Sequence, residues 1–409
     1  MKRTLKLNLN NFDPIPESLA ESLPLLPNFS DHVDFLEVDL CELFHHLYLD
    51  NYGQNVPNPN PIHQLYINML TDEDEFCFRG DGLGSHKEAK IGESNRFGKA
   101  FCRWFLYKHC SITYFAHLDK VLGRKNHGFS KLNGFNLRRI DKGDTPDYLC
   151  FDERKNIPYI AEAKGTYSSI SFKNAKFNEW RNQFKRVQLV DSKSKTYSIK
   201  GYIVATRFKN EHNSRSESQI LAEDPITNGE FPIENNDDLS RRFRRFIYCN
   251  HYAYIFNKLK LPLLGTALEF GFNIPQSIRF TVGLWRCLVP PILEQEFIGG
   301  YFLPTLSSEQ QLFYINPFIY DDSSNLINIP LNPQLNLSLP GFTFFGLERN
   351  VFDRVRRITS RGSEFWEQLG VYENEYDERE EKPQGLSILR DGSVLAPLDY
   401  FQFIETIEI

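Results

Sequence analysis

Two acidic residues and a lysine, Asp147, Glu162 and Lys164, have the chemistry needed to act together on a phosphate ester. Mg²⁺ prefers oxygen ligands and usually binds one or two carboxylates, keeping waters and room for a substrate phosphate. A metal held in this way polarises the phosphoryl oxygen and lowers the pKa of a bound water. A lysine ammonium beside it can orient that water or neutralise developing charge. These residue types therefore suit metal-dependent cleavage of a phosphodiester bond.

The predicted local structure brings the three side chains to one point. Residues 147–152 and 157–164 have strand patterns and are separated by four polar residues, so they are predicted to form a hairpin. With those four residues in the turn, Asp147 lies opposite Glu162, with Cβ atoms roughly 5 Å apart. Lys164 follows Glu162 by two residues, so the strand period places it on the same face. The alternative is an ordinary cross-strand charge cluster on an exposed sheet face.

Elements on both sides of the hairpin are predicted from their own periodicity. Apolar residues recur at helical spacing from Ser94 to His109 and again from Phe177 to Val190. Ile112–Phe115 is predicted to form a strand before the hairpin, and a long polar connection with several glycines follows it. Gly201–Arg207 is predicted to form a buried strand. The hairpin is thus expected between two helices that pack against a sheet.

Pro146, Asp147, Glu162 and Lys164 resemble the motif of the PD-(D/E)xK nuclease superfamily. The core of that family is ordered helix, strand, strand, strand, helix, strand, and residues 93–208 can be read in that order. The resemblance covers under a third of the chain. It implies an α/β protein with a restriction-endonuclease-like core, a mixed central sheet flanked by helices, and additional N-terminal and C-terminal regions.

The same resemblance implies two further site residues. Family members often add a carboxylate from the first helix and a polar residue from the second, and Glu93 and Gln183 are the candidates. The implied metal ligands are then Asp147, Glu162 and Glu93, and the implied catalytic residues are Asp147, Glu162, Lys164 and Gln183. The alternatives are a Glu93 carboxylate favoured by the helix dipole and a Gln183 on a solvated helix face.

The charge distribution supports an anionic partner for one part of the chain. The chain has 47 Lys and Arg against 53 Asp and Glu, a net charge of -6. Residues 101–210 nevertheless hold 22 basic and 9 acidic residues. Neutralisation of phosphates supplies most non-specific affinity for nucleic acid, so this segment suits such a partner, unless acidic regions cover it. Six basic residues precede the site in a connection that could reach a groove: Arg124, Lys125, Lys131, Arg138, Arg139 and Lys142.

Three regions are expected. Residues 1–92 are acidic and proline-punctuated, with helices predicted at Val38–Leu49 and around Ile62–Leu70, and we expect a covering or partner-binding region. Residues 93–210 form the nuclease-like domain, and residues 211–409 an α+β region for recognition, regulation or assembly. This last region has two arginine clusters, the first of which opens a predicted helix that runs to about residue 259; each could pair with acidic neighbours or with phosphate. The clusters are Arg241, Arg242, Arg244 and Arg245, and Arg354, Arg356, Arg357 and Arg361.

Composition argues against several other classes of protein. The chain has no run of eighteen apolar residues and does not begin with a signal-peptide pattern, so no membrane span and a cytoplasmic location are expected. Its seven cysteines are odd in number and form no CxxC pair, which argues against a disulfide framework or a zinc ribbon. No ATP-binding motif is found.

The leading expectation is an endonuclease that hydrolyses DNA with Mg²⁺, for which Mn²⁺ could substitute, in restriction or another anti-phage defence role. A homodimer would suit double-strand cleavage, and a larger defence complex is the other expected assembly. Two alternatives stay open. One is a catalytically silent nuclease-fold subunit that binds nucleic acid or acts as a scaffold, and the other is an RNA nuclease.

Overall fold

A computed structural model of the chain divides into two compact units. Unit 1 comprises residues 1, 52–68 and 252–409, and unit 2 comprises residues 2–51 and 69–251. The structure describes residues 1–20, 32–51, 69–122, 136–152, 157–190, 193–213, 216–225, 237–302, 313–316, 318–320, 326–328, 342–361 and 382–409. The boundaries expected at residues 92 and 210 do not coincide with the division between these units.

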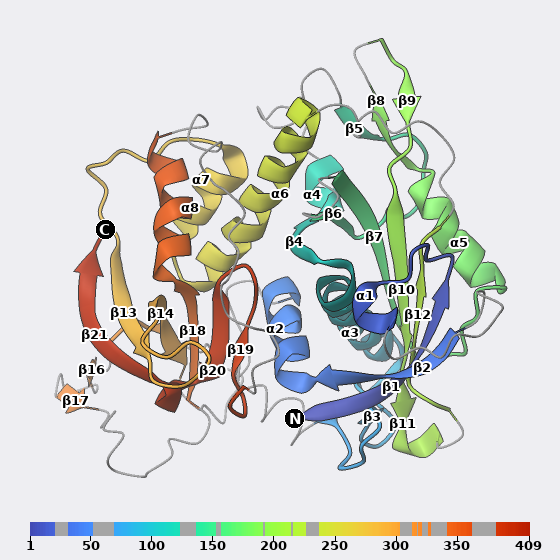
Figure 1. The fold of residues 1–409 in the computed structure, drawn as a ribbon, viewed down its shortest axis with the longest axis horizontal. Coiled ribbons are helices and arrows are strands. Elements are labelled where there is room, and N and C mark those ends of the chain that lie inside the picture. Colours follow the sequence, from blue (N-terminus) through green and yellow to red (C-terminus); the bar gives the residue numbers. More distant parts are fainter. Residues whose placement is uncertain are drawn as a thin grey trace. The chain divides into compact units, whose positions relative to one another are not determined.

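Unit 2 is built on a mixed seven-stranded sheet (Figure 1), with strand order β2-β1-β12-β10-β7-β6-β4. β7 pairs in parallel with β10 and antiparallel with β6, and β6 pairs antiparallel with β4. The expected mixed α/β architecture with a mixed central sheet flanked by helices is therefore confirmed. The strands are β1 (Lys2–Asn10), β2 (His32–Asp39), β4 (Ile112–His117), β6 (Tyr148–Asp152), β7 (Ile157–Thr166), β10 (Gly201–Arg207) and β12 (Gln219–Glu223).

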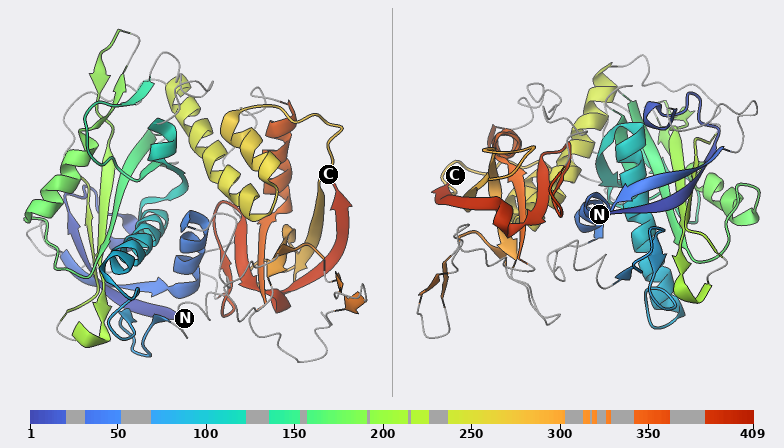
Figure 2. Two further views of the ribbon diagram at one scale, coloured as in Figure 1. Left: turned by 180° about the vertical axis from the view of Figure 1, so that it is seen from behind. Right: turned by 60° about the horizontal axis from the view of Figure 1, so that its bottom comes forward.

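Helices α3 (Lys87–Cys110) and α5 (Ala175–Phe184) lie on opposite faces of this sheet, as Figures 1 and 2 show. The alternation of side chains along β10 explains the arrangement. Ile203 and Ala205 pack with Phe177 of α5. Tyr202 points the other way, toward α3, because it stacks on a phenylalanine ring that also contacts α3.

The predicted hairpin and the strands beside it are confirmed. Asp152 pairs with Ile157, and the register along β6 and β7 is the expected one. The strand predicted at Ile112–Phe115 extends to His117. The strand predicted at Gly201–Arg207 has the predicted bounds. The predicted turn, residues 153–156, lies outside the described residues.

The prediction of a second helix as far as Val190 was wrong. The helix ends at Phe184, and β8 (Val187–Val190) pairs with β5 (Asn136–Arg139) and β9 (Thr196–Tyr197) in a separate small sheet. Val187 and Leu189 are buried on alternate positions, which is strand periodicity. The polar connection after β4 likewise contains a short helix, α4 (Leu118–Leu122), and β5 itself.

The N-terminal residues contribute two strands to the central sheet of unit 2. β1 pairs with β12 and β2 at one side of the central sheet, and Leu5, Leu7 and Leu9 are buried. Helix α2 (Leu40–Asn51) follows β2 and agrees closely with the prediction of Val38–Leu49. Most of the helix predicted around Ile62–Leu70 lies outside the described residues. The shorter elements of unit 2 are α1 (Glu17–Ala20), β3 (Cys77–Phe78), β11 (Lys209–Asn210) and a 3₁₀ turn at Glu211–Asn213.

Unit 1 contains a second antiparallel sheet of order β19-β20-β18-β14-β13-β21, with β15 paired to β14. Buried aromatic and aliphatic residues around Trp285 form its core. Helix α6 (Asp237–Lys258) confirms the predicted arginine-rich helix, and the boundary between the units falls within it, after His251. The remaining elements are α7 (Pro262–Phe270), β13 (Thr281–Cys287), β14 (Glu296–Phe302), β15 (Phe313–Tyr314), β16 (Phe318–Tyr320), β17 (Leu326–Asn328), β18 (Thr343–Glu348), α8 (Arg349–Arg361), β19 (Ser387–Ile388), β20 (Ser393–Pro397), a 3₁₀ turn (Leu398–Tyr400) and β21 (Phe401–Glu408).

None of the helices in the described ranges combines the length and apolar character that a membrane crossing would need.

Candidate active site

The hairpin of β6 and β7 places Asp147 over the middle of β7. The backbone N–H of Asp147 donates to the carbonyl of Ala161 at 3.0 Å. Its side-chain Oδ2 accepts a hydrogen bond from the backbone N–H of Ala163, also at 3.0 Å. These two bonds hold the Asp147 carboxylate beside Glu162, which lies between the two alanines.

Glu162 is a fully buried carboxyl group whose oxygens are poorly satisfied. Its side chain is 0% exposed, and Lys164 Nζ lies 2.5 Å from Oε1. Apart from this ion pair and a side-chain contact with Asp147, neither oxygen has a hydrogen-bond partner within the described part of the chain. Burial raises the pKa of Glu162 to about 8; the charge of Asp147 raises it further, and Lys164 opposes the shift. A buried carboxyl group held beside a second carboxylate is a strong candidate ligand for a cation, which would displace its proton.

Lys164 completes the group that the sequence predicted. It follows Glu162 by two residues on β7, and both project on the face of the sheet covered by α5, because they pair in register with Ile203 and Ala205 of β10. Burial lowers the pKa of Lys164, but the carboxylates of Glu162 and Asp147 outweigh this and raise it. Lys164 is therefore an ammonium ion at neutral pH.

A second lysine, which sequence reasoning did not assign to the site, comes from α3. Lys99 Nζ lies 3.1 Å from Oδ1 of Asp147. Burial lowers the pKa of Lys99, and the charges of Asp147 and Asp50 reverse that effect and raise it. In the sequence, Lys99 is one of several basic residues on the polar side of a helix, so its type and position carry no signal that separates it from them.

Two glycines bring α3 close enough for Lys99 to reach the site. A Cβ atom on Gly165 of β7 would lie 1.7 Å from the carbonyl oxygen of Ser94, and one on Gly98 would lie 2.4 Å from the backbone nitrogen of Gly165. The helix and the strand therefore touch through backbone atoms, directly beside Lys164. A glycine inside the helix, Gly98, is a sequence signal for some close approach, but it does not indicate which strand the helix meets.

Asp50, at the end of α2, is a buried carboxylate whose charge acts on Lys99. Its side chain is 1% exposed and lies 3.4 Å from Arg103 and 3.5 Å from His117 Nε2. It also accepts a 2.7 Å hydrogen bond from the Tyr148 hydroxyl. Burial raises the pKa of Asp50, but His117, Arg103 and that hydrogen bond together lower it, so this carboxylate stays charged. Sequence reasoning missed Asp50 because it lies about a hundred residues before the hairpin.

The structure does not bring Glu93 to the carboxylate pair. α3 begins at Lys87, so Glu93 lies in its second turn, where it forms a 3.3 Å ion pair with Arg96. Its charge acts on Tyr167, beyond the end of β7, and raises the pKa of that hydroxyl. Among the described residues, no three His, Cys, Asp or Glu side chains come together as a metal-binding group. Within the described ranges, Asp147 and Glu162 are thus not joined by a third protein carboxylate.

Gln183 lies on the sheet-facing side of α5 and is only 4% exposed, so the solvated-face alternative does not hold. Its Oε1 atom has no hydrogen-bond partner in the described part of the structure. Gln183 lies on the same side of the sheet as Glu162 and Lys164, but no hydrogen bond within the described ranges joins it to either of them.

No family model, curated protein or solved structure matches the chain. What the site can do must therefore follow from its own geometry.

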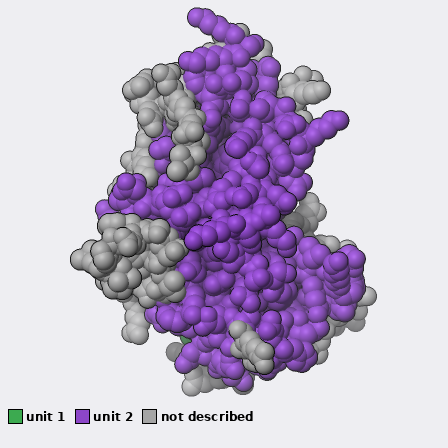
Figure 3. Space-filling view, turned by 90° about the vertical axis from the view of Figure 1, so that its right-hand side faces the viewer, with its two compact units in different colours: residues 1, 52–68, 252–409 green, residues 2–51, 69–251 purple. Residues whose placement is uncertain are grey.

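A small basic sheet borders the loop that leads into Asp147. Ile140 donates its backbone N–H to the carbonyl of Arg186 beside β8, and the Arg186 guanidinium donates to the carbonyl of Asp144 at 2.8 Å. The loop before Asp147 is therefore fixed to the β5-β8-β9 sheet. Exposed basic residues on this sheet and beside it are Arg138, Arg139, Lys142, Lys185, Lys193 and Lys195. Three of the six basic residues expected in the connection, Arg124, Lys125 and Lys131, lie outside the described residues. Figure 3 shows the face of unit 2 that carries α5.

Proposed function

We propose that residues 93–210 form a restriction-endonuclease-like core and that the chain is a Mg²⁺-dependent endonuclease acting on DNA. The observation that carries this proposal is the Glu162 carboxyl group, which is fully buried, beside Asp147 and paired with Lys164. The element order α3, β4, β6, β7, α5 and β10 supports the fold. β5, α4, β8 and β9 are additions to that order.

The residues present fit a Mg²⁺ ion, because Mg²⁺ is commonly held by one or two carboxylates and waters, with substrate phosphate as a further ligand. Asp147 and Glu162 are the two ligands, and a bound cation would stabilise the charged form of the buried Glu162 carboxyl group. When bound, the ion supplies charge stabilisation at the phosphoryl group and an acidified water.

The two lysines have different roles in this proposal. Lys164 is already held against Glu162, so its ammonium orients the attacking water and stabilises negative charge that develops on the phosphoryl oxygens. Lys99, which comes from α3, neutralises the charge of Asp147 in the absence of a divalent ion. Asp50 keeps Lys99 charged and in place.

DNA is the proposed substrate because exposed basic residues surround the approach to Asp147 through the β5-β8-β9 sheet. Contacts between such residues and phosphates fix the position of a duplex without reading its sequence. The net charge of the whole chain, -6, does not oppose this because the basic residues are concentrated in one segment.

A second candidate function is supported by one observation. The 3.1 Å contact between Lys99 and Asp147 already satisfies one of the two carboxylates with a cation. A chain in which Lys99 permanently replaces the metal would bind nucleic acid without cleaving it.

Cleavage assays separate the two candidates. Purified full-length protein is incubated with supercoiled plasmid, linear duplex, single-stranded DNA and RNA, with Mg²⁺, with Mn²⁺ and with EDTA. Lys164→Ala is compared with Lys185→Ala, which removes an exposed lysine of the same segment. We expect metal-dependent DNA cleavage that is lost in Lys164→Ala and kept in Lys185→Ala, with DNA affinity near normal in both.

Retention of cleavage by Lys164→Ala would refute its catalytic role. Metal-dependent binding of DNA without cleavage by the wild-type protein would favour the silent nuclease-fold subunit, and cleavage of RNA alone would identify an RNA nuclease.

A further inference from the structure

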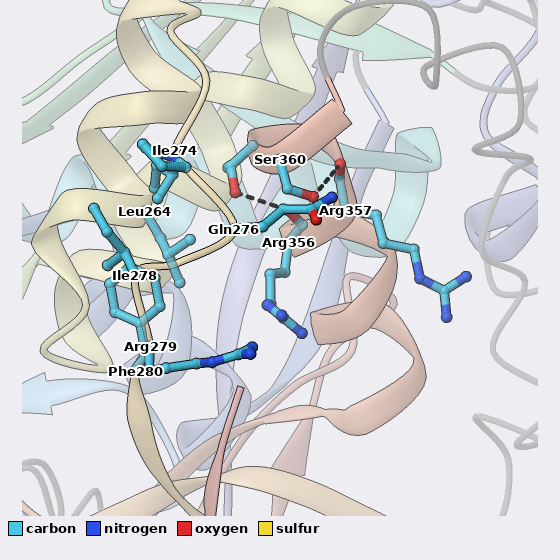
Figure 4. Close-up of a pocket in the computed structure, with 11 residues that line it drawn as sticks. Leu264, Ile274, Gln276, Ile278, Arg279, Phe280, Arg356, Arg357 and Ser360 are labelled. Atoms are coloured by element: carbon cyan, nitrogen blue, oxygen red, sulfur yellow. Dashed lines mark hydrogen bonds between the residues drawn. The ribbon is translucent and has the colours of Figure 1, made fainter.

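A pocket of about 320 Å³ lies in unit 1, between the C-terminal part of α8 and the segment that joins α7 to β13 (Figure 4). Its volume falls at the lower end of the range for small-molecule sites. One wall is apolar and includes Leu264, Ile274 and Ile278, the last of which is 40% exposed. The other side carries arginines. The pocket therefore offers a ligand both apolar surface and positive charge.

Two guanidinium groups converge in this pocket. Figure 4 shows the side chain of Arg279, from the segment before β13, and that of Arg356, from α8, ending close to each other, whereas the side chain of Arg357 points away from them. No ion pair or side-chain hydrogen bond involves any of these three guanidinium groups within the described residues. The pocket thus contains two positive charges for which the described part of unit 1 supplies no paired anion.

The backbone around the pocket is fixed before any ligand binds. The Ile274 N–H donates to the carbonyl of Thr359 at 2.7 Å, which joins the segment after α7 to α8. Phe280, next to Arg279, exchanges two 3.0 Å backbone hydrogen bonds with Ile409. A site whose walls are already in place loses less conformational entropy on binding than one that must order itself.

We propose that this pocket binds a phosphate-bearing ligand of nucleotide size. The planar guanidinium groups of Arg279 and Arg356 match the oxygens of a phosphate in a bidentate geometry, and two positive charges balance a phosphate monoester. The apolar wall of Leu264 and Ile278 takes the uncharged part of the ligand. The same chemistry is offered by a free nucleotide and by the phosphorylated end of a nucleic-acid strand. This proposal does not depend on nuclease activity at Asp147 and Glu162.

Binding to the full-length protein tests the proposal. Fluorescent AMP and a short oligonucleotide with a fluorescent 3′ end and a 5′ phosphate are titrated with protein and followed by anisotropy, in EDTA so that no cleavage intervenes. Unlabelled AMP, inorganic phosphate and the same oligonucleotide without the 5′ phosphate serve as competitors. Arg279→Ala and Arg356→Ala are compared with Arg354→Ala, which removes an exposed arginine of α8 that does not line the pocket.

We expect saturable binding of a phosphorylated probe that weakens about tenfold or more in Arg279→Ala and in Arg356→Ala, because each removes a charge-assisted contact. Arg354→Ala should bind within about twofold of the wild-type protein. Tighter binding of AMP identifies a free nucleotide as the ligand, and tighter binding of the oligonucleotide, dependent on its 5′ phosphate, identifies a strand end. Equal binding by the wild-type protein and both pocket variants, or no saturable binding of either probe, overturns the proposal.

Discussion

Replacement of Glu162 by glutamine tests whether burial holds this carboxyl group protonated in the metal-free protein. The side chain is fully buried, and its pKa is raised from 4.5 to about 8. The unfolded chain loses this proton near pH 4.5, but the folded chain keeps it until about pH 8. The contribution of Glu162 to the free energy of unfolding is therefore greatest below about pH 4.5, and it decreases as the pH rises toward 8.

The magnitude follows from the two pKa values. Between them, the wild-type protein loses about 1.4 kcal/mol of unfolding free energy per pH unit relative to Glu162→Gln. Between pH 6 and pH 8 the difference between the two proteins should grow by about 2 kcal/mol, because the folded group begins to ionise near pH 8. A change in unfolding free energy caused by the glutamine side chain itself does not depend on pH, so it does not affect this slope.

The assay is hydrogen exchange of peptides from β6 and β7 in EDTA at several pH values, corrected for the intrinsic pH dependence of exchange. It reports the stability of unit 2 without assuming that the whole chain unfolds in one step. Glu179→Gln, which removes an exposed carboxyl group from α5, serves as the control and should follow the wild-type protein. An identical pH dependence in the wild-type protein and Glu162→Gln would refute the raised pKa and its cause.

Further substitutions test the contacts that position the site. Gly165→Ala should destabilise unit 2 by about 3 kcal/mol or more, because its Cβ would lie 1.7 Å from the carbonyl oxygen of Ser94; a change below about 1 kcal/mol in hydrogen exchange would contradict this close crossing. Asp50→Ala should cost about 3–5 kcal/mol, because it leaves the buried Arg103 without its carboxylate, and unchanged exchange of α2 and α3 peptides would contradict it. Lys99→Met should tighten Mn²⁺ binding, measured by electron paramagnetic resonance, if Lys99 competes with the ion for Asp147; weaker binding would show that Lys99 supports the metal-bound state instead.

The hairpin was predictable because its information is local. Strand period and the four-residue turn fix the register, so the position of Asp147 beside Glu162 followed from counting residues. The short apolar run of Gly201–Arg207 similarly located β10. Such features depend only on residues close together in the sequence.

Lys99 and Asp50 were not predictable in the same way. Their roles depend on where α2 and α3 pack, and this is set by the backbone contact of Gly98 with Gly165, which no local pattern encodes. The C-terminal end of α5 was not predicted correctly because Phe184 and Val187 are three residues apart. This spacing fits a continuous helix, and it also fits a helix that ends at Phe184 before a strand that begins at Val187. Pairing with β5, about fifty residues earlier, decides in favour of the strand.

The most direct test of the metal site is titration of the full-length protein with Mn²⁺ at pH 8, for the wild-type chain and for Asp147→Asn. This measurement needs no knowledge of the substrate or of any activating partner. We expect saturable binding to the wild-type protein, with release of about half a proton from Glu162 at this pH, and binding at least tenfold weaker in Asp147→Asn because one charged ligand is removed. Equal affinity in the two proteins would show that Asp147 and Glu162 do not form a metal site.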